Sequence, residues 1–410
     1  MKKRSILLVI VSFISIIILS VNSNNKYLVK EESLATYIDG EKTDSFPAKG
    51  TVAFSKADCD NNTNIEWDND NWGLYVTNLS NKVKCNIYFK TGENAVTKIT
   101  SLASSDTTTM ASDDPDNNIR YIGANPNNYV YFNCSDYANQ TSDTCEKWRI
   151  IGLFNNIEKE DGTKENLIKI IRNDSIGQYS WNTSSDGNGY NDWTRAKLMQ
   201  LLNPEYSLKK VNNSLYYYAK SGNCYNSGML AYTSCDFTST GLKKTSTRRA
   251  IETVIWNIGG NFASSGPNSL IASNSYQQER GTGVYEGHNT LWTGKIGLIY
   301  PSDYGYATSG GQIMNRDACL NVTMFNWANS GYEDCKNNNY LYNSEEIKWT
   351  MTADANSNNH LINIYNGGNV NRYDSLAYWY PSIYPTLYLK SNILIIGGDG
   401  SLNTPYQLGI

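Results

Sequence analysis

Eight cysteines, arranged in four neighbouring couples, constrain the fold of this 410-residue chain more than any other feature. No CxxC motif occurs, so the sequence does not support zinc knuckles or thioredoxin-type redox sites. We predict nearest-neighbour pairing, because each couple falls inside one local segment. Each bridge would close a short loop and stabilise the fold by about 3 kcal/mol. The predicted disulfides are Cys59–Cys85, Cys134–Cys145, Cys224–Cys235 and Cys319–Cys335.

The N-terminus indicates export. Three cations at 2–4 precede an apolar run from Ser5 to Val21, a pattern typical of a secretory signal. The run is also just long enough for a short membrane-spanning helix. We therefore interpret residues 1–25 as a signal peptide or an N-terminal membrane anchor. Either way the rest of the chain is expected to be extracellular, secreted or anchored by the N-terminal helix, where disulfides persist.

Composition excludes several classes of protein. The net charge is −4, so the chain lacks the basic footprint of a nucleic-acid-binding protein. Only two histidines are present, which disfavours a histidine-built metal site. The chain has 31 Tyr and 10 Trp, too many aromatic residues for general disorder.

The body of the chain divides into two predicted domains. Residues 26–95 alternate in the period-2 manner of strands and read as a small β-sandwich-like domain. Residues 96–118 are rich in Ser, Thr and Asp and are predicted to be a flexible linker. Residues 119–410 form the large domain. Expected strands lie at 33–38, 51–55, 73–76, 84–89, 148–154, 167–172, 295–300 and 386–389.

Two helices are predicted in the large domain. The first begins after Asn191 or Asp192, places leucines at a helical spacing and ends before Pro204. The second begins near Ser246 or Thr247 and carries isoleucine and valine at i, i+3, i+4 and i+7 up to Gly259-Gly260. Two helices, short strands and much loop predict an α+β fold.

Several stretches carry a resemblance to a known group of proteins. They are WRIIG (148–152), IKIIR (168–172), YNDWTRAKLMQLLN (190–203), TGKIGLIYPSDYGYAT (293–308), KWTMT (348–352), the Cys319/Cys335 segment and the tail 387–408. In these the chain resembles exported proteins of gut Firmicutes whose C-terminal module looks like the C-type-lectin fold in its formylglycine-generating-enzyme-like form. DSFPAKG (44–50) and 67–79 look like a companion domain of the same proteins. The group has no assigned function, so the resemblance implies a fold and no chemistry.

Catalytic motifs are scarce. The enzyme namesake of the fold uses a reactive cysteine pair, whereas all eight cysteines here fall into structural couples. His288 and His360 each stand alone, and no GxSxG, HExxH or P-loop occurs. The sequence therefore favours a non-enzymatic role. The alternative is a cell-wall or glycan-acting hydrolase using a carboxylate pair among Glu279, Glu286 and Asp303.

No cofactor is expected, and calcium is the one metal that the sequence leaves open. Asp58, Asp60, Asn62 and Asn64 resemble a calcium loop. The EF-hand pattern fails, however, because Thr63 stands where glycine is required, and Asx turns explain the cluster better.

Residues 353–384 are the best candidate for a recognition face. The segment is dense in Asn, Tyr, Ser and Trp, the side chains that binding loops favour. We therefore interpret the protein as a binding module for an extracellular protein or glycan, with a structural envelope component as a third reading. An ordinary polar surface explains the same composition. The candidate ligand-binding residues are Asn356, Asn358, His360, Asn363, Tyr365, Asn369, Asn371, Tyr373, Asp374, Tyr378, Trp379 and Tyr384.

Overall fold

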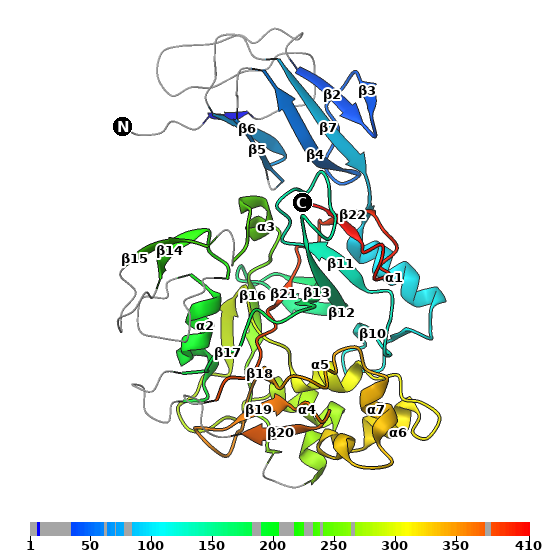
Figure 1. The fold of residues 1–410 in the computed structure, drawn as a ribbon, viewed down its shortest axis with the longest axis vertical. Helices are drawn as coiled ribbons and strands as arrows, with labels where there is room; N and C mark the ends of the chain where they lie inside the picture. The colour runs from blue at the N-terminus through cyan, green and yellow to red at the C-terminus, as the bar shows by residue number, and fades with distance from the viewer. Residues whose placement is uncertain are drawn as a thin grey trace.

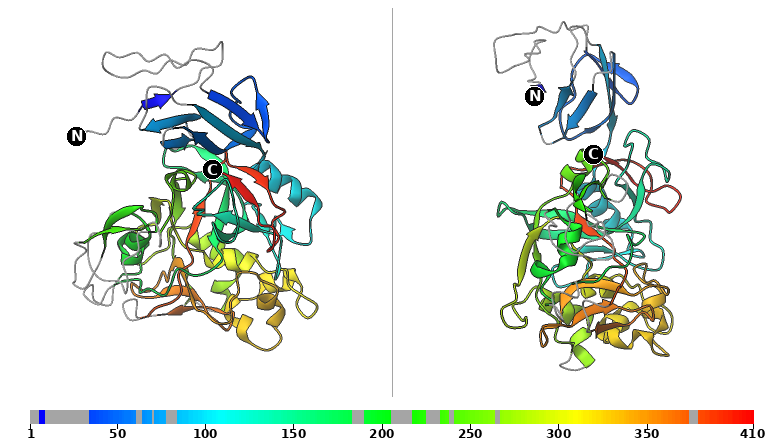
Figure 2. Two further views of the ribbon diagram at one scale, coloured as in Figure 1. Left: turned by 45° about the horizontal axis from the view of Figure 1, so that its top comes forward. Right: turned by 60° about the vertical axis from the view of Figure 1, so that its left-hand side comes forward.

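The fold combines many small sheets with a few short helices, which is the mixture of an α+β protein (Figure 1). The structure is a computed structural model. It describes residues 6–8, 34–60, 64–69, 71–77, 84–182, 190–204, 217–224, 233–237, 241–263, 267–373 and 379–410. The N-terminal β strands form one end of the molecule, and the large domain fills the other in every view (Figure 2).

The N-terminal domain is built from two small sheets. One has the order β3-β2-β7-β4, and the other has the order β1-β6-β5. Trp67, Leu74, Ile87 and Phe89 form the centre of its core. The four strands expected in this region are confirmed. The bounds are β1 Ile6–Leu8, β2 Leu34–Ile38, β3 Glu41–Thr43, β4 Val52–Cys59, β5 Asn64–Asp68, β6 Gly73–Thr77 and β7 Cys85–Thr91.

The segment 96–118 contains regular structure in place of the expected linker. Helix α1 (Ala95–Ser105) begins at Asn94, whose side chain accepts hydrogen bonds from two backbone amides of the first turn. Ala95 and Ile99 are buried against the large domain, and two short strands flank the helix. The prediction failed because numerous Ser and Thr residues mask a narrow apolar stripe. The flanking strands are β8 (Glu93–Asn94) and β9 (Met110–Ala111).

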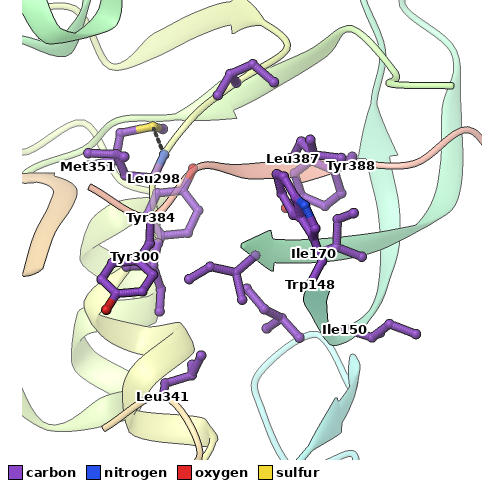
Figure 3. Packing of buried hydrophobic residues seen from close by; sticks show 14 of the residues in the cluster. Trp148, Ile150, Ile170, Leu298, Tyr300, Leu341, Met351, Tyr384, Leu387 and Tyr388 are labelled. Atoms are coloured by element: carbon purple, nitrogen blue, oxygen red, sulfur yellow. Dashed lines mark hydrogen bonds between the residues drawn. The ribbon is translucent and has the colours of Figure 1, made fainter. Parts of the chain in front are cut away.

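The large domain is organised around an antiparallel sheet of order β21-β13-β12-β10-β9, with β11 paired to β12. The predicted strands at 148–154, 167–172 and 386–389 are confirmed within it. Trp148, Ile150, Ile170 and Leu387 project from three neighbouring strands into one core (Figure 3). The bounds are β10 Ile119–Tyr121, β11 Tyr129–Phe132, β12 Glu146–Glu158, β13 Lys164–Arg172 and β21 Thr386–Tyr388.

The two predicted helices have different outcomes. The first is present as the 3-10 helix η3 (Trp193–Arg195), capped by Asp192, followed by α2 (Lys197–Leu202). The second prediction is wrong, because helix α3 stops at Arg249 and the following residues form strand β16, paired with β17. β-Branched residues fit a pleated strand at least as well as a helix, and cross-strand packing decides between them. The bounds are α3 Thr245–Arg249, β16 Val254–Asn257 and β17 Leu291–Gly294.

The strand predicted at 295–300 is absent. This stretch makes one isolated bridge, between Gly297 and Thr386, and leads into α5. The other elements of the large domain are η5 Pro267–Leu270, α4 Ala272–Glu279, α5 Pro301–Tyr306, α6 Arg316–Asn321, η6 Met324–Ala328, α7 Glu333–Asn337, β14 Ser221–Cys224, β15 Thr233–Asp236, β18 Lys348–Ala353, β19 Leu361–Ile364, β20 Val370–Tyr373, β22 Leu394–Gly397 and β23 Gln407–Gly409.

Three of the four predicted disulfides are formed. Cys59–Cys85 joins β4 to β7, Cys134–Cys145 closes a short loop, and Cys319–Cys335 joins α6 to α7. The side chains of Cys224 and Cys235 lie outside the described part of the chain. Bridges of this kind persist in oxidising compartments and indicate an extracellular environment.

The expected signal or anchor segment, residues 1–25, is described only at Ile6–Leu8, which pair with β6. Within the described ranges, none of the helices has both the length and the apolar character needed to cross a membrane.

Candidate functional site

The candidate recognition face is centred on the hairpin β19–β20. In its register Asn363 lies opposite Asn371, and Leu361 lies opposite Tyr373. Directly opposed residues of an antiparallel pair project to the same side of the sheet. The hairpin therefore places two of the predicted asparagines and one predicted tyrosine on a single face.

Aromatic side chains gather at this hairpin. Tyr373 stacks on Trp379 with ring centroids 4.6 Å apart and planes inclined by 21°, and Tyr365 lies 6.4 Å from Tyr373. All three are half-buried, and the neighbouring Tyr380 is 43% exposed. We call Tyr365, Tyr373 and Trp379 the aromatic row. The tertiary structure thus joins three of the anchors that were proposed from sequence.

The loop at 354–360 adjoins the hairpin through an ion pair. The guanidinium of Arg372, on β20, donates to a carboxylate oxygen of Asp354 at 3.3 Å. Asp354 is fully buried, whereas the Arg372 side chain is 42% exposed. The contact therefore ties the exposed strand to the base of the loop.

Asn191 holds the same loop from the opposite side. Its side-chain amide donates to the backbone carbonyls of Ser357 and His360 at 2.7 and 2.6 Å, with that of Asp354 at 3.2 Å. Its backbone amide donates to the carbonyl of Asn358 at 2.7 Å. Asn191 is 1% exposed, so the staple is buried. The loop that carries the predicted residues is consequently fixed from two elements far apart in sequence.

Two predicted ligand-binding residues are buried and cannot contact a ligand. Asn363 is 0% exposed, and neither atom of its amide has a hydrogen-bond partner in the described structure. Tyr384 is 5% exposed, and its hydroxyl donates to the carboxylate of Glu346. The period-2 pattern that favoured these positions does not reveal which residues are covered by neighbouring elements.

The other predicted residues are distributed around the aromatic row. Asp374 and Tyr378 lie outside the described residues. Asn356 is exposed, whereas Asn358, His360, Asn369 and Asn371 are half-buried. The imidazole Nδ1 of His360 lies 2.6 Å from the hydroxyl of Ser357, within the loop itself.

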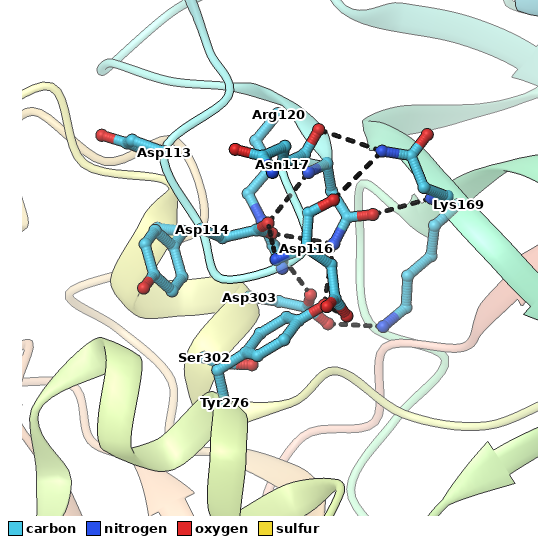
Figure 4. Close-up of polar contacts among 12 residues, drawn as sticks. Asp113, Asp114, Asp116, Asn117, Arg120, Lys169, Tyr276, Ser302 and Asp303 are labelled. Carbon is cyan, nitrogen blue, oxygen red and sulfur yellow. Dashed lines mark hydrogen bonds and ion pairs between the residues drawn. The ribbon is translucent and has the colours of Figure 1, made fainter.

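The carboxylates proposed for hydrolysis are placed differently. Asp303 is 0% exposed and lies in a buried ionic cluster (Figure 4). Its two oxygens are 2.9 Å from Arg120 Nη1 and 2.5 Å from Lys169 Nζ, and Arg120 also pairs with Asp114 at 2.6 Å. Burial alone would raise the pKa of Asp303, but Lys169 and Arg120 outweigh it and hold that pKa at about 2.

Glu279 is also fully buried, at the end of α4. It accepts hydrogen bonds from the backbone amide of Ser302, at 2.9 Å, and from the Ser302 hydroxyl. Burial raises its pKa to about 7, against the opposing charge of Arg280. Glu286 is exposed on a loop. Two of the three carboxylates are thus unavailable to a polymeric substrate.

The described residues include no cluster of three or more His, Cys, Asp or Glu side chains suited to a metal ion. In the calcium-like stretch, Asp58 forms a surface ion pair with Lys56 at 2.8 Å. Asn62 lies outside the described residues.

A second aromatic patch was missed by the sequence analysis. Tyr190 and Tyr285 are 42% and 40% exposed, and their rings lie 6.3 and 5.8 Å from the imidazole of His288. The guanidinium of Arg195 lies 3.5 Å from the centroid of the Tyr190 ring. Tyr190 precedes the staple residue Asn191, so the patch adjoins the 354–360 loop. Its members come from distant segments, and no local pattern predicts their approach.

Comparison with known proteins found no matching family model, curated protein or solved structure.

Proposed function

We propose that the chain is an exported, non-enzymatic binding protein that recognises an extracellular protein or glycan through the aromatic row and the adjoining loop. The observation that carries the proposal is the half-buried stack of Tyr373 on Trp379, with Tyr365 beside it. Such rings provide large contact areas at little cost in conformational entropy. Half-buried Asn369 and Asn371 supply amide donors and acceptors next to them.

Rigidity supports this assignment. The Asn191 staple and the Arg372–Asp354 ion pair hold the loop before any ligand arrives. A preorganised surface loses less entropy on binding, so more of its contact energy appears as affinity.

Enzyme function receives less support. Asp303 and Glu279 are engaged in buried contacts, and no free cysteine occurs among the described residues. A reactive thiolate needs an accessible and electropositive setting. The hydrolase alternative would have to rely on Glu286 with a partner that the predictions did not name.

The proposed architecture follows the same division. Residues 119–410 would be a C-type-lectin-like domain of the formylglycine-generating-enzyme type, preceded by a β-sandwich-like domain. Short helices and small sheets around a central antiparallel sheet support this reading. The disulfides support display outside the cell, either secreted or attached through the N-terminal segment.

Array binding tests the proposal. The exported chain would be screened on glycan and protein arrays, together with the variants Tyr373→Ala and Trp379→Ala. Loss of one hot-spot aromatic should weaken binding by about 2 kcal/mol, or roughly 30-fold.

A matched control is available in the N-terminal domain. Tyr37 and Tyr88 form a second stacked pair there, with centroids 4.9 Å apart. Tyr88→Ala should leave binding unchanged. Equal losses in the control and the row variants, or no ligand on either array, would contradict the proposal.

A further inference from the structure

The two domains enclose a crevice at their junction. The larger part is an empty space of about 390 Å³, open to solvent, between the N-terminal sheets and strands β22 and β23. A second space of about 290 Å³ adjoins it, and Asn69 and Asn392 line both. The crevice is therefore continuous across the boundary, with Asn69 from the N-terminal domain and Asn392 from the large domain.

Indole rings form one wall. Trp67 and Trp72 pack edge to face with centroids 4.9 Å apart. Trp72 Nε1 donates to the carbonyl of Pro47 at 2.8 Å, so its hydrogen-bonding capacity is used. Trp67 is 5% exposed, and its Nε1 is buried without a partner. A buried indole N–H without an acceptor is costly unless something in the crevice accepts from it.

The opposite wall leaves an acceptor open. Oδ1 of Asn392 is buried and has no hydrogen-bond partner. The neighbouring amide of Asn94 is committed, because it caps α1 and donates to the carbonyl of Ser391 at 2.7 Å. One donor and one acceptor, contributed by different domains, thus face the same crevice.

We propose that this crevice binds a single sugar residue, as a site separate from the aromatic row. A hydroxyl group both accepts and donates, so one polyhydroxylated ring can satisfy Trp67 Nε1 and Asn392 Oδ1 together. The apolar C–H face of such a ring packs on an indole, as expected for a pocket with aromatic walls and few polar groups. No acidic or histidine side chain lines the crevice, so it needs no metal.

Both domains contribute to the site, so its occupation should tie them together. A ligand that binds only the folded, closed junction stabilises it by mass action. The melting temperature of the whole chain should therefore rise with the concentration of a sugar that binds.

The test is a calorimetric titration of the exported chain with glucose, galactose, mannose and N-acetylglucosamine, each taken to saturation. We expect one of them to bind at one site. Trp67→Phe removes the N–H and keeps an aromatic ring, and should weaken binding about tenfold. Asn392→Leu removes the acceptor and should have a similar effect, whereas Asn392→Asp keeps an acceptor oxygen and should bind more tightly than Asn392→Leu.

The double variant Tyr373→Ala, Trp379→Ala separates this proposal from the proposed function. It should lose the array ligand and keep the calorimetric site. Thermal unfolding of each variant without sugar shows whether a loss reflects misfolding, and Asn392→Leu, at a half-buried position, is the second variant if Trp67→Phe unfolds. Failure of all four sugars to bind the unchanged chain would overturn the proposal and identify the crevice as hydrated space. Unaltered affinity in Trp67→Phe and Asn392→Leu would overturn it equally.

Discussion

The buried ionic cluster and the aromatic row use opposite kinds of side chain in opposite surroundings. Arg120, Lys169 and Asp303 carry formal charges and are 1%, 0% and 0% exposed. The aromatic row is uncharged and remains partly open to solvent. Charges that look catalytic in the sequence therefore serve the interior, whereas neutral aromatic and amide groups are left for recognition. Four predictions test this contrast.

The largest effect is expected from Asp303→Asn. The substitution leaves Lys169 and much of the Arg120 charge uncompensated in the core, and loss of one partner of a buried pair costs about 3–5 kcal/mol. The free energy of unfolding, measured in denaturant, should fall by that amount. Asp161→Asn is the control, because Asp161 is 3.8 Å from Lys159 at an exposed site and should change little. A small effect at Asp303 would mean that the cluster does not hold the core.

The second prediction concerns pH. The folded-state pKa of Glu279 is raised from 4.5 to about 7, so its protonated form is favoured in the fold. Its contribution to stability is fully present below pH 4.5 and is lost as the pH rises through about 7, a change of about 2–3 kcal/mol. Glu279→Gln should flatten unfolding free energy over this window.

Asp303 has the opposite sign. Its pKa is lowered from 3.8 to about 2, so its contribution is present above pH 3.8 and is lost as the pH falls through about 2. Denaturation curves of the unchanged chain and of Glu279→Gln at pH 4, 6 and 8 provide the comparison. Parallel curves for both proteins would contradict the assignment to Glu279.

The third prediction concerns the row itself. Tyr373→Ala should weaken ligand binding by about 2 kcal/mol, with a smaller loss of folding stability because the ring is half-buried. Asp303→Asn, assayed at a temperature where it is folded, should retain affinity. The reverse outcome, with affinity sensitive to Asp303 and insensitive to Tyr373, would break the contrast between the two regions.

The smallest effect is expected from Arg372→Ala. Its side chain is 42% exposed, so its ion pair with Asp354 contributes at most about 1 kcal/mol to stability. Because the pair positions the loop, affinity should fall a few-fold, and Arg372→Lys should recover part of it. The same binding assay distinguishes the two substitutions, and full affinity in Arg372→Ala would exclude a positioning role.

Local patterns predicted the elements that local interactions decide. Alternation at 84–89 identified β7, and Asp192 marked a real helix start. The same reasoning failed at 251–258, where the isoleucines face a partner strand, and at 96–118, where packing against the large domain stabilises α1. In both cases the deciding contact comes from residues distant in sequence.

The sequence by itself determined the cysteine couples and the supply of aromatic and amide side chains, because these depend only on residue type and spacing. Three couples form the predicted bridges. Only the tertiary structure decided which residues of 353–384 are covered and which charges are neutralised. Asn363 is buried and Tyr373 is stacked on Trp379 because of strand register and neighbouring segments, and burial, which sets the pKa of Glu279 and the reach of Asp303, is a property of the whole packed chain.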